Sequence, residues 1–221
     1  MDPSRAATLL LVRHAETECN VAARLSGWTD SHLSARGEAQ VELLAAHFNR
    51  AHGHAAAIYA SPLVRTRRTA EAIARLTGHR PIFDPDLREM HFGELDGQPL
   101  EHVRAGYAEL LLLDESLEED FAWPGGESRS AFSARVRAVI DRISAAHPGQ
   151  AVAVVTHGGV ISTFLTIVHG QPAGLWREWL VNNASLTEVA WDPVAGAGAL
   201  LRRGDDAHLA ELLDEEVDAA G

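Results

Sequence analysis

The stretch LLLVRHAETECN, residues 9–20, changes abruptly from apolar to polar at Arg13. A second stretch, AVAVVTHGG at residues 151–159, changes in the same way. Each apolar run has the length and composition of a buried strand, and each delivers a histidine, His14 or His157, at its carboxyl end. Since open α/β sheets bind ligands just outside the carboxyl ends of their strands, both histidines are expected at a ligand site. The arginine beside the first histidine indicates an anionic ligand, with phosphate as the leading candidate.

Length and composition predict an ordinary cytoplasmic protein. The 221 residues fit one domain, and a hydrophobic content of 46% is enough to bury a core. No apolar run approaches the ~20 residues that span a bilayer, and no signal-peptide pattern opens the sequence, so no membrane partner is expected. The single cysteine, Cys19, excludes an internal disulfide and agrees with a reducing compartment.

Charge separates a main body from a short terminal segment. The net charge of −12 argues against a nucleic-acid partner, which would require a basic surface. Seven of the acidic residues lie within residues 205–221, which contain no arginine. We therefore predict a single domain over residues 1–204 and a solvated acidic tail over residues 205–221.

The basic residues also restrict the chemistry. All 19 are arginine, and the sequence contains no lysine. A P-loop nucleotide site and a pyridoxal-phosphate site each need a lysine, so both are excluded. No cofactor is predicted, and any phosphate must be bound by arginine, histidine, backbone amides or helix N-termini.

Hydrophobic periodicity predicts strands that alternate with helices. The expected helices cover residues 34–50, 66–77, 100–113, 128–147 and 160–168, with Ser34 as an N-cap and Gly78 closing the second helix. The expected strands cover residues 8–12, 56–60, 81–83, 151–155, 186–191 and 200–203, and the last two form a hairpin at a sheet edge. This pattern predicts an α/β fold with a mostly parallel central sheet, helices on both faces and a C-terminal edge hairpin.

A set of short motifs resembles the histidine phosphatase superfamily, whose members have the phosphoglycerate mutase-like fold. The motifs occur in the family's order over roughly residues 8–165: LVRHAET (11–17) with Asn20, RLSGWTD (24–30), LSARG (33–37), SPLVRT (61–66), LREMHFGE (87–94), PGGES (124–128) and THGG (156–159). Ala15 stands where the family usually has glycine. One Arg-His pair would be weak evidence, whereas a complete ordered set is specific.

The resemblance implies a role for each motif residue, and elementary phosphate chemistry agrees with these roles. His14 is predicted to attack phosphorus and form a phosphohistidine, with its other ring nitrogen donating a proton to a backbone carbonyl. Arg13 and Arg65 are expected to bind the phosphoryl oxygens, with further contacts from His157 and Asn20. The arginines and histidines already provide the positive charge that stabilises a phosphoryl group, so no metal is predicted.

Glu89, in the LREMHFGE motif, is the predicted general acid and base. It would protonate the leaving oxygen and then activate the water that hydrolyses the phosphohistidine. Glu94 in the same motif is the weaker candidate for this role. By analogy with the family, residues 98–123 are expected to form a cap over the pocket. The five acids within residues 110–120 are expected to form a solvated face, and His91, near the acid motif, is expected to line the pocket.

Several simpler interpretations remain for individual residues. His14 could be a buried structural histidine, Arg65 could belong to a solvated helix start, Glu89 could be an exposed carboxylate and Asn20 could cap a turn. The pair His52 and His54 lacks further ligands at metal-binding spacing, so a surface loop is the preferred interpretation. A cysteine phosphatase has an arginine six residues after its cysteine, but the residue at that position here is Leu25. Cys19 is therefore interpreted as a small apolar side chain.

The prediction is therefore a metal-independent phosphomonoesterase that hydrolyses a small phosphorylated metabolite through a phosphohistidine. Mutases of the family have a longer insertion than the 26 residues, 98–123, that separate Gly97 from Pro124 here. This analogy favours hydrolysis. A cofactor-dependent phosphoglycerate mutase and a non-catalytic phosphate-binding module remain alternatives, and a homodimer is the candidate assembly.

Overall fold

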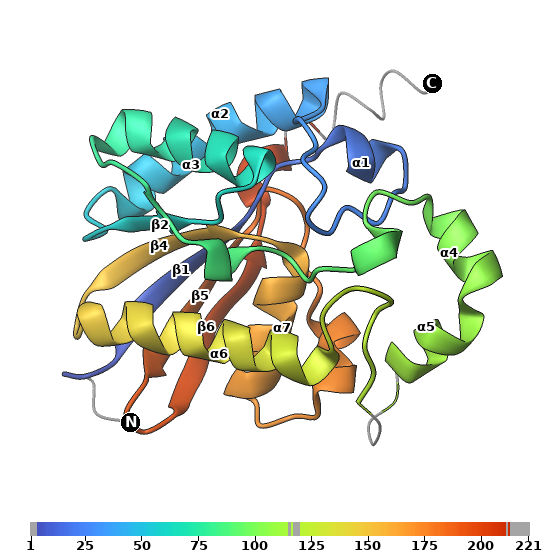
Figure 1. Ribbon diagram of the computed structural model, residues 1–221. Coiled ribbons are helices and arrows are strands. Elements are labelled where there is room, and N and C mark those ends of the chain that lie inside the picture. Colours follow the sequence, from blue (N-terminus) through green and yellow to red (C-terminus); the bar gives the residue numbers. More distant parts are fainter. Residues whose placement is uncertain (1–3, 115, 117–119, 211, 213–221) are drawn as a thin grey trace.

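The opening apolar stretch forms β1 (Ala7–Arg13), a central strand of the sheet (Figure 1). The computed structural model describes residues 4–114, 116, 120–210 and 212. β1 pairs in parallel with β4 (Ala151–Thr156), and the register places Arg13 opposite Thr156. The two apolar stretches singled out in the sequence are therefore neighbouring strands that end at the same level.

Six strands form one sheet in the order β3-β2-β4-β1-β5-β6. The strands β2 (Ile58–Ala60) and β3 (Ile82–Phe83) continue the parallel part beyond β4. On the other side of β1, β5 (Leu186–Asp192) runs antiparallel to it and pairs with the edge strand β6 (Ala197–Asp205). The predicted mostly parallel sheet with a C-terminal edge hairpin is confirmed.

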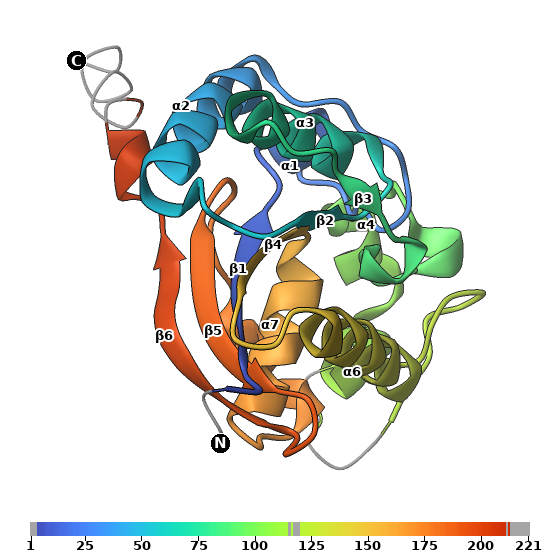
Figure 2. The same ribbon diagram turned by 90° about the vertical axis from the view of Figure 1, so that its left-hand side faces the viewer.

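Helices cover both faces of the sheet (Figure 2). One face carries α2 (Ala35–His52) and α3 (Val64–Thr77), and the other carries α6 (Arg129–Ala146) and α7 (Gly158–Val168). The described residues also form α1 (Glu18–Val21), α4 (Leu100–Gly106), α5 (Ala108–Asp114) and short 3₁₀ helices at Pro85–Leu87, Gly93–Leu95, Ala173–Trp179 and Ala207–Leu209.

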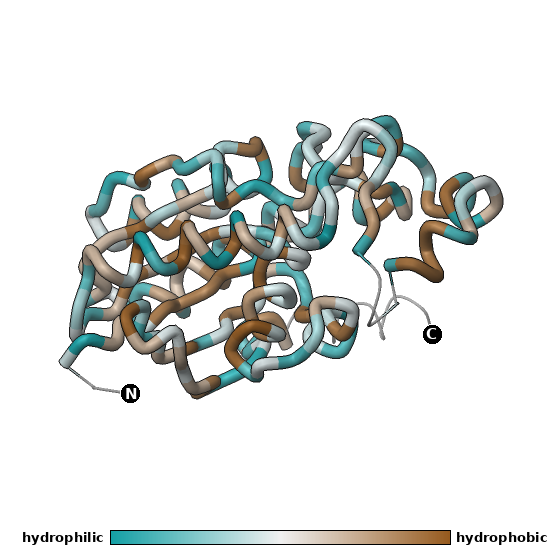
Figure 3. Tube along the Cα trace, turned by 60° about the horizontal axis from the view of Figure 1, so that its bottom comes forward, coloured by the Kyte–Doolittle hydropathy of each residue, from teal (hydrophilic) through white to brown (hydrophobic). Residues whose placement is uncertain are grey.

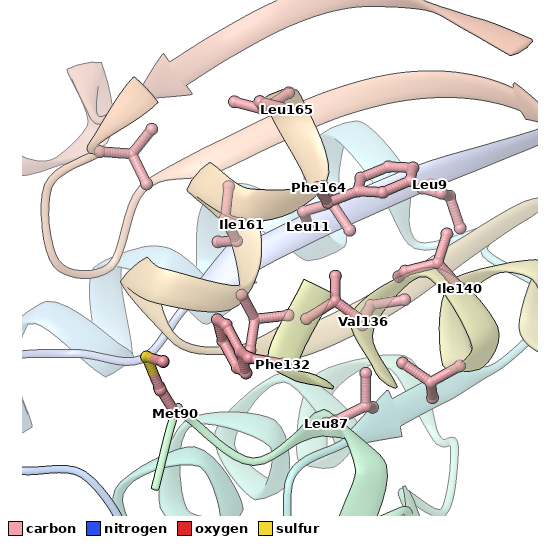
Figure 4. Close-up of a cluster of buried hydrophobic side chains, with 14 of the residues drawn as sticks. Leu9, Leu11, Leu87, Met90, Phe132, Val136, Ile140, Ile161, Phe164 and Leu165 are labelled. Atoms are coloured by element: carbon pink, nitrogen blue, oxygen red, sulfur yellow. The ribbon is translucent and has the colours of Figure 1, made fainter. Parts of the chain in front are cut away.

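Alternation along β1 divides the core into two clusters, because successive strand side chains point to opposite faces. Leu9 and Leu11 pack with α6 and α7 in one cluster, part of which is shown in Figure 4. Leu10 and Val12 pack with α2 and α3 in the other. Each fully buried aliphatic side chain contributes about 1.5–3 kcal/mol. Figure 3 shows hydrophilic and hydrophobic residues interspersed along the chain, as expected for helices that bury one face and expose the other.

Local signals set several helix ends, and those at Ser34 and Gly78 were predicted. Ser34 caps α2 by accepting a hydrogen bond from the Gly37 amide, and Ser128, for which no cap was predicted, caps α6 in the same way. Gly78 ends α3 in the left-handed conformation, with a φ of 75°.

The predicted helix over residues 100–113 is wrong in one respect, since the chain forms two helices with a break at Tyr107. Gly106 precedes the break, and glycine is a poor helix former. The expectation that all five acids within residues 110–120 form a solvated face is also wrong, because Asp114 is only 4% exposed and pairs with Arg177 at 3.0 Å. Three of these acids lie outside the described residues.

The start of the predicted acidic tail is packed against the domain. Asp205 is the last residue of β6, and Leu209 is buried in the cluster that contains α2. The His208 ring stacks on His47, with 4.8 Å between ring centroids. The rest of the predicted tail, apart from Leu212, lies outside the described residues. No helix in the described part of the chain is long and apolar enough to cross a membrane.

Candidate active site

The candidate site lies where β1 and β4 end side by side. The chain leaves β1 toward α2 on one face of the sheet and leaves β4 into α7 on the other, so the two strand ends form a topological switch point. A cavity of about 210 Å³ opens here. Arg13, His14, Asn20, Arg65 and Glu89 all line it. Five of the six predicted site residues therefore share one cavity.

His14 follows directly from β1 and is only 4% exposed. Its Nδ1 lies 2.7 Å from the carbonyl oxygen of Ala15, which can only accept, so Nδ1 carries the proton and Nε2 has a free lone pair. Burial, reinforced by the charges of Arg65 and Arg13, lowers the pKa of His14 well below its usual value. The ring is therefore neutral and holds its proton against a backbone carbonyl, as predicted, and its role as nucleophile stays a prediction.

Ala15, which replaces the family's usual glycine, fits without strain. The residue is fully buried, and its φ is not positive. Its amide donates to Thr69 Oγ1 at 3.3 Å. The backbone after the nucleophile therefore does not require glycine here.

Both predicted phosphate-binding arginines are held by backbone carbonyls, and Arg65 is buried whereas Arg13 is half-buried. Arg65 is fully buried and donates from Nη1 to Thr29 O at 2.9 Å and from Nη2 to Gly27 O at 2.7 Å. Arg13 donates from Nη1 to Val181 O, while its buried Nε has no protein partner among the described residues. Burial lowers the pKa of each guanidinium, and the Glu89 carboxylate opposes this. These fixed cations suit a phosphoryl group.

His157 is not among the residues that line the cavity, but its side chain contacts His14 and Arg65, which are. Its ring makes an edge contact with His14, with 5.3 Å between centroids. Nδ1 accepts from Arg65 Nε at 3.3 Å, which leaves the proton on Nε2, 2.8 Å from Ser61 Oγ. Burial and the charge of Arg65 lower its pKa well below the usual value. In this arrangement His157 positions Arg65, and its direct contact with phosphate stays a prediction.

Glu89 joins the cavity from the segment that precedes α4. Its Oε1 accepts from the Met90 amide and its Oε2 from the Gly159 amide in the first turn of α7, both at 2.9 Å. A helix N-terminus favours a nearby carboxylate, so α7 fixes this side chain in the cavity wall. Glu94, the alternative acid, is not among the lining residues. The geometry therefore favours Glu89 as the proton donor.

Asn20 caps a turn, which was one of its two predicted roles, and it also lines the cavity. Its Oδ1 accepts from the Thr17 amide at 3.1 Å, and the Thr17 side chain caps α1 in return. Asn183 Nδ2 is 3.3 Å from the same oxygen. Because these contacts use the amide oxygen, the NH₂ group is the part that can donate to a ligand. The contact with phosphate stays a prediction.

Sequence reasoning missed the loop of residues 181–185 before β5. Val181 O accepts from Arg13, the Ala184 amide donates to His14 O at 3.1 Å, and Asn183 Nδ2 donates to the same carbonyl at 3.0 Å. The loop thus holds the backbone of the nucleophile. The only signal was the turn-forming sequence NNAS, which does not show what the turn contacts.

The two glycines after His157 were also given no role. A Cβ on Gly159 would lie 2.9 Å from Glu89 Cδ and still closer to Oε1, and one on Gly158 would lie 3.2 Å from Arg13 Nε. The glycines therefore let both functional side chains approach the start of α7. A glycine pair beside a predicted histidine was the available signal.

The remaining expectations concern His91, a metal site and Cys19. His91 does not line the cavity as expected, because its ring stacks on Trp28 at 4.4 Å and pairs with Asp96 at 3.4 Å. Among the described residues, no group of three or more His, Cys, Asp or Glu side chains could hold a metal ion. Cys19 is buried in α1, in agreement with its interpretation as a small apolar side chain.

Comparison with known proteins gives the family. Residues 9–203 match the family model of the histidine phosphatase superfamily (branch 1). The chain belongs to the histidine phosphatase superfamily. It is similar to a probable phosphoglycerate mutase GpmB from Serratia proteamaculans, with 34% identity over 93% of this chain and 96% of the relative.

Solved histidine phosphatases show the same fold. A mycobacterial glucosyl-3-phosphoglycerate phosphatase has a TM-score of 0.80 and 27% identity, covering 91% of this chain and all of that one. That phosphatase has also been solved with VO3 and with inorganic phosphate. A phosphoglycerate mutase from Bacillus anthracis, at 24% identity, 94% and 97% coverage and a TM-score of 0.75, adds agreement in fold. The relatives thus include proteins named as phosphatases and as mutases.

Proposed function

We propose that this protein is a metal-independent phosphomonoesterase that hydrolyses a small phosphorylated metabolite through a phosphohistidine on His14. One observation carries the proposal: the neutral His14 ring keeps its proton on Nδ1 and has Nε2 free, in a cavity that Arg13, Arg65 and Glu89 also line. A neutral imidazole beside fixed cations is suited to attack a phosphate dianion.

In the first step, Arg13 and Arg65 bind the phosphoryl oxygens, and Nε2 of His14 attacks phosphorus. The N–P bond forms as the ester P–O bond breaks. Protonated Glu89 gives its proton to the leaving oxygen, which departs as an alcohol. The hydrogen bond from Nδ1 to Ala15 O stabilises the positive charge that develops on the ring.

In the second step, water enters where the alcohol left. The Glu89 carboxylate accepts a proton from this water as its oxygen attacks phosphorus. The N–P bond breaks, inorganic phosphate forms, and His14 returns to its neutral state. The products are one alcohol and one phosphate, and Glu89 ends protonated as it began.

A phosphoglycerate mutase is the second candidate, favoured by the names of curated relatives at 32–34% identity. A mutase would use the same nucleophile and arginines but return the phosphoryl group to a second hydroxyl. The short segment of 26 residues, 98–123, supports hydrolysis. Its residues Leu100 and Asp114 contribute to the cavity wall.

The test is a screen of phosphorylated sugars, glycerate derivatives and nucleotides for phosphate release, with EDTA and with vanadate. Hydrolysis that survives EDTA and is inhibited by vanadate supports the proposal. Conversion of 3-phosphoglycerate that depends on a trace of 2,3-bisphosphoglycerate, without phosphate release, supports the mutase. Binding of phosphate without any turnover supports a non-catalytic module. Loss of hydrolysis with EDTA contradicts the metal-independent mechanism.

A further inference from the structure

The cavity is lined differently at its two ends. Around His14 the lining is cationic and polar, as described above. Further out, the walls consist largely of apolar side chains drawn from separate segments of the chain: Leu25, Phe92, Leu100, Phe132, Trp176 and Leu180. Because phosphorus must reach His14, the alcohol part of a bound ester would extend into this outer, apolar part.

The charged residues in the outer walls each have at least one protein partner. Arg129 donates from Nη1 and Nη2 to the backbone carbonyls of Ser116 and Leu113, and its buried Nε has no partner among the described residues. Arg24 donates from Nη1 to Gly97 O at 2.8 Å, at an exposed position on the rim. Asp114 pairs with Arg177 at 3.0 Å.

These hydrogen bonds and the ion pair limit which ligand groups the outer walls can bind. A ligand carboxylate would enter largely apolar surroundings near the negative charge of Asp114, and the single Nε–H of Arg129 could pair with only one of its two oxygens. Burying a charge without a dedicated partner is costly, whereas burying an apolar group is favourable. The remaining polar groups in these walls, Ser26 and Thr163, are neutral.

We infer that the cavity selects phosphate monoesters of uncharged, apolar or aromatic alcohols over esters that carry a second anionic group, such as phosphoglycerates. The inference rests on the proposed function, and it names the substrate class of the same site. Trp176, in the 3₁₀ helix Ala173–Trp179, is assigned as a residue that determines this specificity.

The test compares three esters of primary alcohols, so that the reactivity of the leaving group is matched: 2-phenylethyl phosphate, glycerol 3-phosphate and 3-phosphoglycerate. The kcat/KM for the phenylethyl ester should exceed that for each of the others by about tenfold or more, as expected for burying one aromatic ring. Equal or higher kcat/KM with 3-phosphoglycerate would overturn the inference.

A pair of tryptophan variants tests the assignment of Trp176. Trp176→Ala should lower kcat/KM for the phenylethyl ester about tenfold, mainly through KM, and leave glycerol 3-phosphate within about twofold. Trp179→Ala is the matched control, because Trp179 lies in the same 3₁₀ helix but does not line the cavity and instead donates to Gln171 at 2.6 Å. Equal losses on both substrates in Trp176→Ala would overturn the assignment.

Failure of the proposed function gives a result that differs from failure of the inferred selectivity. If the wild type releases phosphate from none of the three esters, their binding to His14→Ala is measured by calorimetry. Tighter binding of 2-phenylethyl phosphate than of 3-phosphoglycerate would then support the inferred selectivity while hydrolysis fails. The opposite order would overturn the inference as well.

Discussion

The inner and outer halves of the cavity are built in different ways. The inner half combines the ends of two adjacent strands with Arg65 of α3 and Glu89 of the segment before α4, and its polar groups are buried or half-buried and fixed by hydrogen bonds to backbone carbonyls or amides. The outer half comes from α4, α5, α6, the 3₁₀ helix Ala173–Trp179 and the segments that carry Leu25, Phe92 and Leu180, and most of its side chains are apolar. The inner half therefore presents fixed polar groups, whereas the outer half shapes the part that would receive the alcohol.

Because of this difference, substitutions in the two halves should affect substrates in different ways. Changes in the inner half should affect every substrate, because all substrates present the same phosphoryl group. Changes in the outer half should affect substrates according to their alcohol. The predictions below test the inner half, from the largest expected effect to the smallest.

His14→Ala removes the nucleophile and should lower kcat by about 10⁴-fold or more on every ester. The variant should still bind phosphate, because Arg13 and Arg65 are held by other contacts. His54→Ala, at an exposed position outside the cavity, is the control and should keep full activity. Turnover near the wild-type rate in His14→Ala would remove His14 from the mechanism.

Glu89→Gln should lower kcat by about 10²- to 10³-fold, because the amide cannot transfer a proton. Glutamine can still accept from the Gly159 amide, so the site should keep its shape. Inorganic phosphate should still inhibit this variant, because Arg13 and Arg65 keep their contacts with backbone carbonyls. Glu94→Gln is the matched control, and a larger kcat loss there would reverse the two assignments.

Gly159→Ala should lower kcat by about 10- to 100-fold by displacing the Glu89 carboxylate. The effect should appear in kcat with all esters, as expected for the inner half. Gly106→Ala is the control, because a Cβ there has no neighbour within 4 Å among the described residues. A normal kcat in Gly159→Ala would show that the close approach of Glu89 to α7 is not needed.

The two buried histidines should make stability depend on pH. Their folded-state pKa values are lowered mainly by burial, so below about pH 6.5 the unfolded chain binds protons that the folded chain does not. The free energy of unfolding should therefore fall as pH falls through this value, by up to about 1.4 kcal/mol per pH unit for each histidine.

Urea unfolding of the wild type and of His157→Asn between pH 7.5 and 5 measures this dependence. The variant should show a shallower slope, because one of the two groups is gone. Identical slopes would mean that His157 binds a proton in the folded protein, in conflict with a neutral ring that accepts from Arg65.

Asn183→Ala should have the smallest effect, about 2- to 10-fold in kcat, because it removes single neutral hydrogen bonds to His14 O and Asn20 Oδ1. Asn182→Ala is the matched control, since Asn182 bonds Asp206 on the other side of the loop. If the control lowers kcat as much as Asn183→Ala, the loop acts only through its general stability.

The inner half was largely predictable because its signals are local. An apolar run marks each buried strand, and the residue after it must lie at the sheet edge, so His14 and Arg13 could be located from residues 9–20 alone. The N-caps Ser34 and Ser128 and the left-handed Gly78 are local signals of the same kind. Glu89 was found through its motif, since nothing in its own neighbours indicates burial.

The outer half could not be predicted, because its walls join residues far apart in sequence. Leu25, Leu100 and Trp176 share one cavity only after the whole sheet has formed. The same holds for the loop at residues 181–185, whose contact with His14 depends on β5 pairing beside β1. The burial of Asp114 also depends on tertiary packing, which periodicity does not record, whereas the break at Tyr107 follows a local signal, Gly106, that hydrophobic periodicity does not include.

The most direct test asks where the phosphoryl group goes during turnover. Glu89→Gln is mixed with 4-nitrophenyl phosphate, whose leaving group departs without a proton from Glu89, and is then quenched in alkali to preserve phosphohistidine, digested and analysed by mass spectrometry. The account predicts one added phosphoryl group on the peptide that contains His14, and none on the corresponding peptide of His14→Ala. A phosphoryl group on another residue, or phosphate release with no phosphorylated peptide in either the wild type or Glu89→Gln, would contradict it.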